Sequence, residues 1–213
     1  MEGDVLRGFT KRYWSHKELA EGLHLSRGHL YRLLEEGHML GPDVVVAADN
    51  LGWDPRRARR FGVDTDRLDA DGNPIGPPAD GALAKAATLI KTRYSVKPKV
   101  YLSSWLASYA YGLKASSVYF IRKRSTGFIP ADVVVDGKYG WSEERVIEFG
   151  EQTGRMDDTK INKWMIRRTE EFGLDPDIPW VQRRLNGTAA HLRDRVDQAV
   201  AVWRERQKND QQG

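Results

Sequence analysis

Hydrophobic positions in the first quarter of the chain change from a helical period to a strand period and back. Apolar residues three and four positions apart predict a short helix from His16 to Gly22 and a second helix from Ser26 to about Glu36. Ser15 can cap the first helix, where Glu18 completes a capping box, and Ser26 can cap the second. The pattern therefore predicts two helices joined by a short turn.

A β-hairpin and a third helix follow. The β-branched run Val44–Val46 predicts a strand, Asp49-Asn50 a turn, and Leu51-Gly52-Trp53 the returning strand. Asp54-Pro55 then places an aspartate cap ahead of a proline, which starts a helix that ends near Phe61. The order helix, turn, helix, hairpin and helix is that of a winged helix-turn-helix.

The same order occurs a second time. Residues 13–69, called repeat 1, align with residues 101–157, called repeat 2, at a shift of 88 positions. The alignment holds about 16 identities and a one-residue slip over the valine run, which is reversed before Gly52-Trp53 meets Gly140-Trp141. Two copies are too few for a solenoid, so we expect two similar domains in tandem.

The expected fold class is mainly α with small β-wings (α+β). Aspartate, glycine and proline after residue 62 indicate a linker, which carries one helix over residues 82–94. We expect a winged helix-turn-helix domain at 1–62, the linker at 63–100, a second winged helix-turn-helix domain at 101–157 and an α-helical region at 158–213.

The segment from Lys17 to Arg32 resembles the helix-turn-helix of the MerR and phage-excisionase group. That group has an apolar-Ala pair, a turn of small residues and a Val/Leu-Ser start to the second helix. The hairpin ending in Trp53 also resembles the wing of that group. The resemblance covers residues 13–62 and, more weakly, 101–150, where Lys114 stands in place of the capping serine and Trp105-Leu106 replace Lys17-Glu18.

The resemblance implies that the second helix of each repeat lies in the major groove of double-stranded DNA. Arginines at its exposed positions would pair with guanine or with phosphates. The implied DNA-binding residues are Ser26, Arg27, Gly28, His29, Tyr31, Arg32 and Asn50 in repeat 1, and Lys114, Ala115, Ser116, Ser117, Tyr119, Arg122, Lys123 and Lys138 in repeat 2. Two alternatives without DNA contact stay open. Arg32 could pair with Glu35 or Glu36, and Tyr31 and Tyr119 could pack at the edge of a core.

The C-terminal region ends in a helix with a heptad-like seam. Leu192, Val196, Ala199 and Trp203 repeat at intervals of four, three and four. The seam either covers the second domain or binds a second copy or a partner protein, such as a recombinase.

Composition narrows the function class. The chain has 213 residues with 34 basic and 30 acidic side chains, a formal charge of +4, so a DNA-binding charge must be gathered on one surface. With no cysteine, disulfide scaffolds, cysteine-ligated metals and thiol nucleophiles are excluded. Catalytic motifs and metal-ligand spacings of histidine are missing, so we expect no enzyme activity, cofactor or metal.

The sequence shows no pattern typical of a membrane span or of a secretory signal. No apolar run approaches the roughly 20 residues of a membrane span, and the N-terminus lacks a secretory pattern. We therefore expect a cytoplasmic, nucleoid-associated location.

The leading expectation is a sequence-specific double-stranded DNA-binding protein, a phage or mobile-element transcriptional regulator with recognition helices in successive major grooves. Because the two helices differ, their half-sites should differ, and one chain could bind an asymmetric or directly repeated site. Three alternatives stay open: an excisionase-like recombination directionality or architectural factor, a terminase-small-subunit-like packaging adaptor, and a protein-binding module that does not bind DNA.

Overall fold

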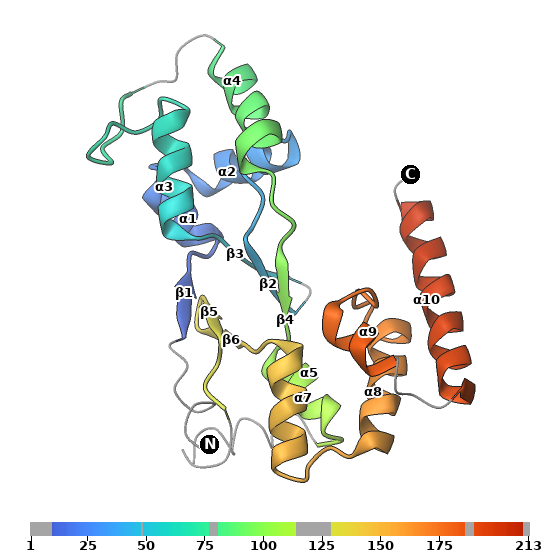
Figure 1. Ribbon diagram of the computed structural model, residues 1–213. Helices are drawn as coiled ribbons and strands as arrows, with labels where there is room; N and C mark the ends of the chain where they lie inside the picture. The colour runs from blue at the N-terminus through green and yellow to red at the C-terminus, as the bar shows by residue number, and fades with distance from the viewer. Residues whose placement is uncertain (1–9, 48, 77–80, 114–128, 186–189, 211–213) are drawn as a thin grey trace.

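A computed structural model describes residues 10–47, 49–76, 81–113, 129–185 and 190–210 (Figure 1). The protein is a mixed α/β structure with two small three-stranded sheets at its centre. In chain order the elements are β1 (Lys11–Tyr13), α1 (His16–Gly22), α2 (Arg27–Glu35), β2 (Val44–Val46), β3 (Asn50–Gly52), α3 (Pro55–Asp64), α4 (Ala82–Leu89), the π-helical turn η1 (Ile90–Tyr94), β4 (Lys99–Tyr101), α5 (Ser104–Ala110), β5 (Val133–Val135), β6 (Lys138–Gly140), α7 (Glu143–Gln152), α8 (Asp158–Glu170), α9 (Pro179–Leu185) and α10 (Ala190–Asp210).

Local signals predict repeat 1 well. Ser15 and Glu18 form the complete capping box of α1, and the Ser26 side chain caps α2. Gly37 has a φ of 71°, the left-handed conformation that ends a helix. α3 continues past the predicted end at Phe61, because Phe61 and Gly62 still face the core. The predicted helix, turn, helix, hairpin and helix are all present in repeat 1.

Each sheet takes its third strand from the other repeat. In repeat 1, β2 and β3 form the antiparallel hairpin, and β4, which leads into repeat 2, adds to β2 in parallel. In repeat 2, β5 and β6 form the hairpin, and β1 of repeat 1 adds to β5 in parallel. The strand orders are therefore β3-β2-β4 and β1-β5-β6. This exchange joins the repeats into one structure, which the prediction of two separate domains did not include.

A small shared core lies between the two sheets. Alternate valines of β2 and β5 point into it and are at most 2% exposed, as expected for the inner face of a strand. The core contains Tyr13, Val44, Val46, Val133 and Val135, with Tyr101 packed against it. This cluster contains residues from both repeats, so neither repeat completes it alone.

Hairpin length explains part of the sequence slip. Three residues of the sequence separate β2 from β3, whereas only Asp136-Gly137, with φ values of 46° and 71°, separate β5 from β6. Two consecutive residues with positive φ are typical of the tight Asp-Gly hairpin turn. The extra residue of the first turn restores the shift of 88 before the glycine-tryptophan pairs.

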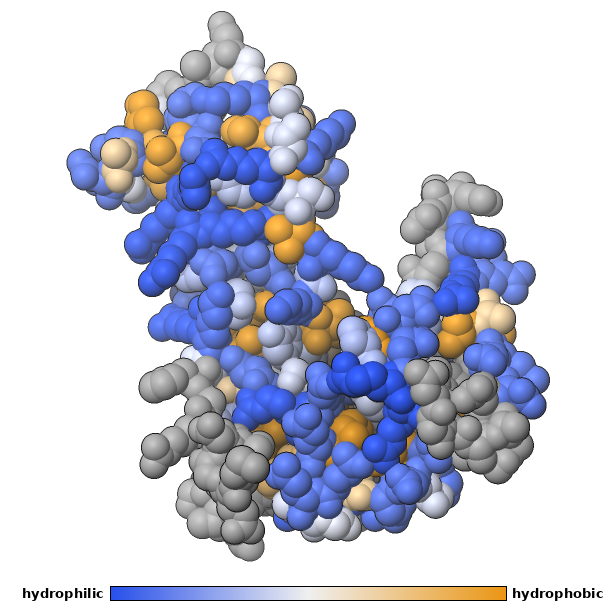
Figure 2. Space-filling model, in the orientation of Figure 1, coloured by the Kyte–Doolittle hydropathy of each residue, from blue (hydrophilic) through white to orange (hydrophobic). Residues whose placement is uncertain are grey.

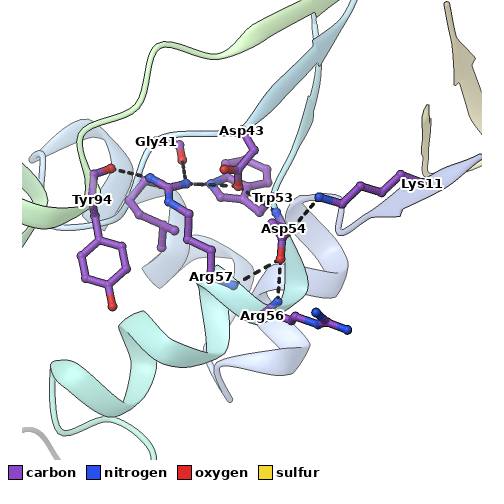
Figure 3. Close-up of polar contacts among 9 residues, drawn as sticks. Lys11, Gly41, Asp43, Trp53, Asp54, Arg56, Arg57 and Tyr94 are labelled. Carbon is purple, nitrogen blue, oxygen red and sulfur yellow. Dashed lines mark hydrogen bonds and ion pairs between the residues drawn. The ribbon is translucent and has the colours of Figure 1, made fainter. Parts of the chain in front are cut away.

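Each hairpin is fixed to its own repeat by a buried tryptophan. Trp53 and Trp141 are fully buried, and their indole nitrogens donate to the carbonyls of Leu40 and Ile129, each at 3.0 Å. An aspartate just before each hairpin makes a matching ion pair. Asp43 binds Arg57 at 3.1 Å and accepts from the backbone of Asp54, as Figure 3 shows. In repeat 2, Asp132 pairs with Arg145 and accepts from Ser142 N.

The linker helix packs on repeat 1. Ala86 and Tyr94 are buried in the core that α1, α2 and α3 share. The Tyr94 hydroxyl donates to Asp64 at 2.5 Å, and its carbonyl accepts from Arg57. Burial and the Asp64 carboxylate raise the pKa of Tyr94 to about 12. The helix predicted over residues 82–94 is therefore a structural part of repeat 1.

The C-terminal region packs on repeat 2 through a buried ion pair. Arg168 of α8 is 2% exposed and donates to both carboxylate oxygens of Glu143 in α7. The indoles of Trp164 and Trp180 donate to the same carboxylate at 2.7 and 3.1 Å. α8 starts at Asp158, and the side chain of Asp157 caps it by accepting from Lys160 N. No helix in the described part of the chain is long and apolar enough to cross a membrane.

Replacing Gly52 with alanine should destabilise the protein. A Cβ at this position would lie 2.7 Å from the γ-methyls of Val44 and Val135 and 2.9 Å from Tyr13 Cβ. Overpacking of this kind costs about 1–3 kcal/mol. Urea unfolding measures the loss. Gly28→Ala is the matched control, because a Cβ there has no neighbour within 4 Å and a helical alanine stabilises by up to about 1 kcal/mol. Equal midpoints for both variants would contradict the shared core.

Glu143→Ala should cost about 3–5 kcal/mol of unfolding free energy, because it leaves Arg168 buried without its partner. The double variant Glu143→Leu with Arg168→Met removes both charges and should recover the part of that loss due to the unpaired arginine, although the indoles of Trp164 and Trp180 still lose their acceptor. Urea unfolding of the single and double variants compares them. A double variant no more stable than Glu143→Ala would show that the ion pair is not the source of the cost.

Candidate nucleic-acid interface

The second helix of repeat 1 presents its predicted reading face to solvent. Leu30 and Leu33 are buried, which turns the opposite side of α2 outward. Arg27, Gly28 and Arg32 are exposed, and Tyr31 is 47% exposed. Ser26 is occupied as the cap, since its hydroxyl accepts from His29 N at 3.2 Å. The expected DNA-facing side of α2 is therefore open, whereas Ser26 has a structural role.

A polar groove of about 240 Å³ runs beside this face. Three of the predicted residues, Arg27, Tyr31 and Asn50, line it together. The groove is also lined by Ser15, His16 and Lys17 at the start of α1, by Asp49 and Leu51 of the first hairpin, and by Val135 and Asp136 of the second hairpin. The structure thus brings α1, α2 and both hairpins to one surface, which we call the reading groove.

His16 supports the Tyr31 ring in this groove. The two rings stack with centroids 5.1 Å apart, and His16 also meets Trp53 edge-on at 4.7 Å. Burial lowers the pKa of His16, so its imidazole is neutral at pH 7. Tyr31 is therefore held at the edge of the Trp53 core while half of its surface stays exposed.

The arginines of α2 make no internal ion pair within the part of the chain that the structure describes. Neither Arg27 nor Arg32 has an ion pair or a side-chain hydrogen bond among those residues, so the alternative pairing of Arg32 with Glu35 or Glu36 is not observed. Lys17 lies 3.9 Å from Glu21, a loose contact between exposed groups. These cations remain available to an external anion.

His29 lies in the first turn of α2, and its imidazole carries no charge at neutral pH. Burial lowers its pKa, and the positive charges of Arg32 and Arg67 lower it further. Arg67 is only 8% exposed, and its Nε has no hydrogen-bond partner among the described residues. The sequence gives one signal for Arg67, its identity with Arg155 in the repeat alignment. Arg67 adds positive potential near the start of α2 that periodicity does not predict.

Asn50 and Lys138, the predicted DNA-binding residues of the two hairpins, differ in how many of their polar groups are already hydrogen-bonded. The Asn50 amide nitrogen donates to Val46 O at 3.2 Å and to Asp49 Oδ1 at 2.7 Å, so the turn uses its donors. Asn50 therefore offers DNA only its amide oxygen. Lys138 at the start of β6 is exposed, and the described residues include no partner for its ammonium.

The matching surface of repeat 2 is only partly described. Its predicted reading residues lie outside the described residues; they are Lys114, Ala115, Ser116, Ser117, Tyr119, Arg122 and Lys123. The first helix of the repeat, α5, differs from α1 because Trp105 and Tyr109 pack against Phe172 at 5.4 and 5.1 Å. Aromatic contacts with the C-terminal region therefore replace the charged face of α1.

Two of the four predicted seam residues, Ala199 and Trp203, are buried or hydrogen-bonded within the chain. Ala199 is 4% exposed, and Trp203 donates its indole N–H to Gly173 O at 3.0 Å. The side chains of Leu192 and Val196 lie outside the described residues. α10 packs along α8, as Figure 1 shows, so the two described seam residues favour the covering role over a dimer seam.

Positive charge is also present away from the groove. Arg56 and Arg60 of α3 are exposed, and the described residues hold no ion pair with either. Arg59, the residue before Arg60, lies over the Trp14 ring at 5.3 Å. In Figure 2, strongly hydrophilic surface covers much of the region around repeat 1 and the central sheets.

Within the described residues, no group of histidine, aspartate or glutamate side chains is arranged to hold a metal ion. Comparisons of the chain with protein-family models, with curated proteins and with solved structures return no match.

Proposed function

We propose that the chain binds double-stranded DNA, with α2 in the major groove and the hairpins beside it. One observation carries the proposal: Arg27 and Arg32 are exposed, and unpaired among the described residues, on a capped helix that borders the polar reading groove. An internally unpaired arginine gains most from an external anion or from the acceptors of guanine. The resemblance of residues 17–32 to the MerR and phage-excisionase group points to the same use of this helix.

Geometry at the start of α2 suits a close approach of the DNA backbone. Gly28 has no atom within 4 Å of the place where a Cβ would stand, so nothing in the described structure shields the helix from a ligand there. The first turn of a helix presents free N–H groups and a partial positive charge, which favour a phosphate. Arg27 adds a full charge beside that turn, and Lys17 of α1 adds another on the groove wall.

Acidic residues in the groove favour base contacts over general charge attraction. Asp49 and Asp136 line it together with Arg27. A carboxylate repels phosphate but accepts a hydrogen bond from the amino group of cytosine. A surface built for phosphates alone would exclude these acids, so their presence supports sequence-dependent binding.

Transcriptional regulation is the role we favour, because the resemblance points to regulators of phages and mobile elements. A recombination directionality factor would use the same surface beside an integrase. A packaging adaptor would need a ring of copies, and a protein-binding module would leave Arg27 and Arg32 without a nucleic-acid role.

The double variant Arg27→Ala with Arg32→Ala should weaken binding to a selected DNA site by about 10–100-fold for each arginine that pairs with a base. It should also lower the slope of log affinity against log salt by about one for each arginine that neutralises a phosphate. Fluorescence anisotropy over a salt series measures both quantities.

The matched control is Arg56→Ala with Arg60→Ala, which removes the same charge from another exposed helix of repeat 1. It should change affinity little, apart from a small general charge effect. Equal reductions in both variants would mean that only net charge attracts DNA. No binding by the unaltered chain at low salt would exclude the DNA-binding proposal.

A further inference from the structure

Strand exchange between the two repeats is reciprocal. β1 of repeat 1 pairs with β5 of repeat 2, and β4 of repeat 2 pairs with β2 of repeat 1. Lys11 faces Val133 in the first pairing, and Lys99 faces Val44 in the second. Val44 corresponds to Val133 in the repeat alignment, and the same shift of 88, extended two residues before the alignment begins, places Lys11 opposite Lys99. The same two surfaces therefore meet twice, once in each direction.

When each repeat adds the same strand to the same strand of the other repeat, the two repeats are related by a two-fold rotation. Repeats related by a translation or a screw would form head-to-tail contacts, and β4 would then face a third repeat rather than return to the first. The glycines of the returning strands confirm the reciprocity. A Cβ on Gly52 would meet Val135, Val44 and Tyr13, and one on Gly140 would meet the corresponding Val46, Val133 and Tyr101.

The exchange also ties the two DNA-facing surfaces together. The reading groove of repeat 1 is lined partly by Val135 and Asp136, which belong to the second hairpin. The first hairpin likewise contacts repeat 2, because Ala47 N donates to Tyr101 O at 3.1 Å just before α5. A hairpin of each repeat thus contacts the other repeat near its first helix, so the repeats cannot turn independently.

We propose that the chain binds an imperfect inverted repeat in DNA and acts as a two-fold pseudo-dimer within a single chain. This inference rests on the DNA binding proposed above. The symmetry of a DNA site mirrors the symmetry of the protein that reads it, so a two-fold relation requires inverted half-sites. The proposal differs from the expectation of an asymmetric or directly repeated site, which follows from the tandem order of the repeats along the chain.

The two half-sites differ because corresponding surface residues differ. Lys17 at the start of α1 corresponds to Trp105 in α5, and Asn50 of the first hairpin corresponds to Lys138 of the second. Repeat 1 therefore offers Lys17 and Asn50 to DNA, whereas repeat 2 offers Lys138, because Trp105 packs against Phe172. One chain fills one complete site, with no second copy needed.

Selection from a random duplex library of about 40 base pairs, long enough for two half-sites one turn apart, provides the site. Three duplexes are then compared with the full chain: the selected site, the same site with one half reversed, and the same site with about 5 extra base pairs between the halves, roughly half a helical turn. Because the repeats are rigidly joined, both altered duplexes should lose the gain from double engagement, about 100-fold or more. An unchanged affinity for either one would overturn the inference.

A second measurement does not depend on base recognition by repeat 2. The chain lacks cysteine, so Asn50→Cys and Lys138→Cys each provide one attachment point for an iron–EDTA label. Both labelled chains are first checked for binding to the selected site, and free iron–EDTA with the unaltered chain is the control. Radicals from each label cut the DNA next to its hairpin.

In the two-fold arrangement the two cutting patterns are mirror images about the centre of the site, on opposite strands. Patterns displaced along the same strand in the same direction would overturn the inference while leaving DNA binding intact. If the unaltered chain selects no DNA at low salt, the proposed function itself fails, and this result is obtained before any cutting experiment.

Discussion

The exchanged strands are the contact on which the rest of the structure depends. Each strand is only three residues long, and an isolated two-stranded hairpin is marginally stable in water. The third strand from the other repeat gives each hairpin a partner and closes the valine core between the sheets. Gly52 and Gly140 are in contact with that core, because larger residues would collide with the valines and tyrosines. The reading groove also depends on this contact, because Val135 and Asp136 of the second hairpin line it.

Local chemistry explains how much of the fold the sequence predicts. The capping box of Ser15 and Glu18, the valine run of β2 and the Asp-Pro start of α3 act over a few residues, and all occur as expected. The pairing of β1 with β5 joins Lys11 to Val133 across most of the chain, and nothing near Lys11 indicates its partner. Only the repeated Lys-x-Tyr at positions 11 and 99 marks both exchanged strands.

The same distinction applies to the candidate site. Helical periodicity turns Arg32 away from Leu30, and Arg32 is exposed. Arg27 lies three positions before Leu30, on the same side of the helix, and is exposed because it is the first residue of α2. Engagement of the Asn50 amide in its own turn depends on the conformation of that turn. The place of Asp136 in the groove and the burial of Arg67 depend on tertiary packing. A linear pattern does not encode such contacts in any local signal.

The charge on one helix surface differs between the two repeats. Arg56 and Arg60 of α3 correspond to Glu144 and Glu148 of α7, so the same helix surface has opposite charge in the two repeats. α9 covers the acidic version, where Arg183 pairs with Glu144, whereas the described residues leave both arginines of α3 without a counter-ion. The same helix surface therefore binds the C-terminal region in repeat 2, whereas in repeat 1 it faces solvent. Repeat 1 as a whole is not basic, with 8 basic and 10 acidic side chains over residues 13–69. Attraction for a polyanion therefore depends on where exposed arginines such as Arg27 and Arg32 lie, and not on net charge.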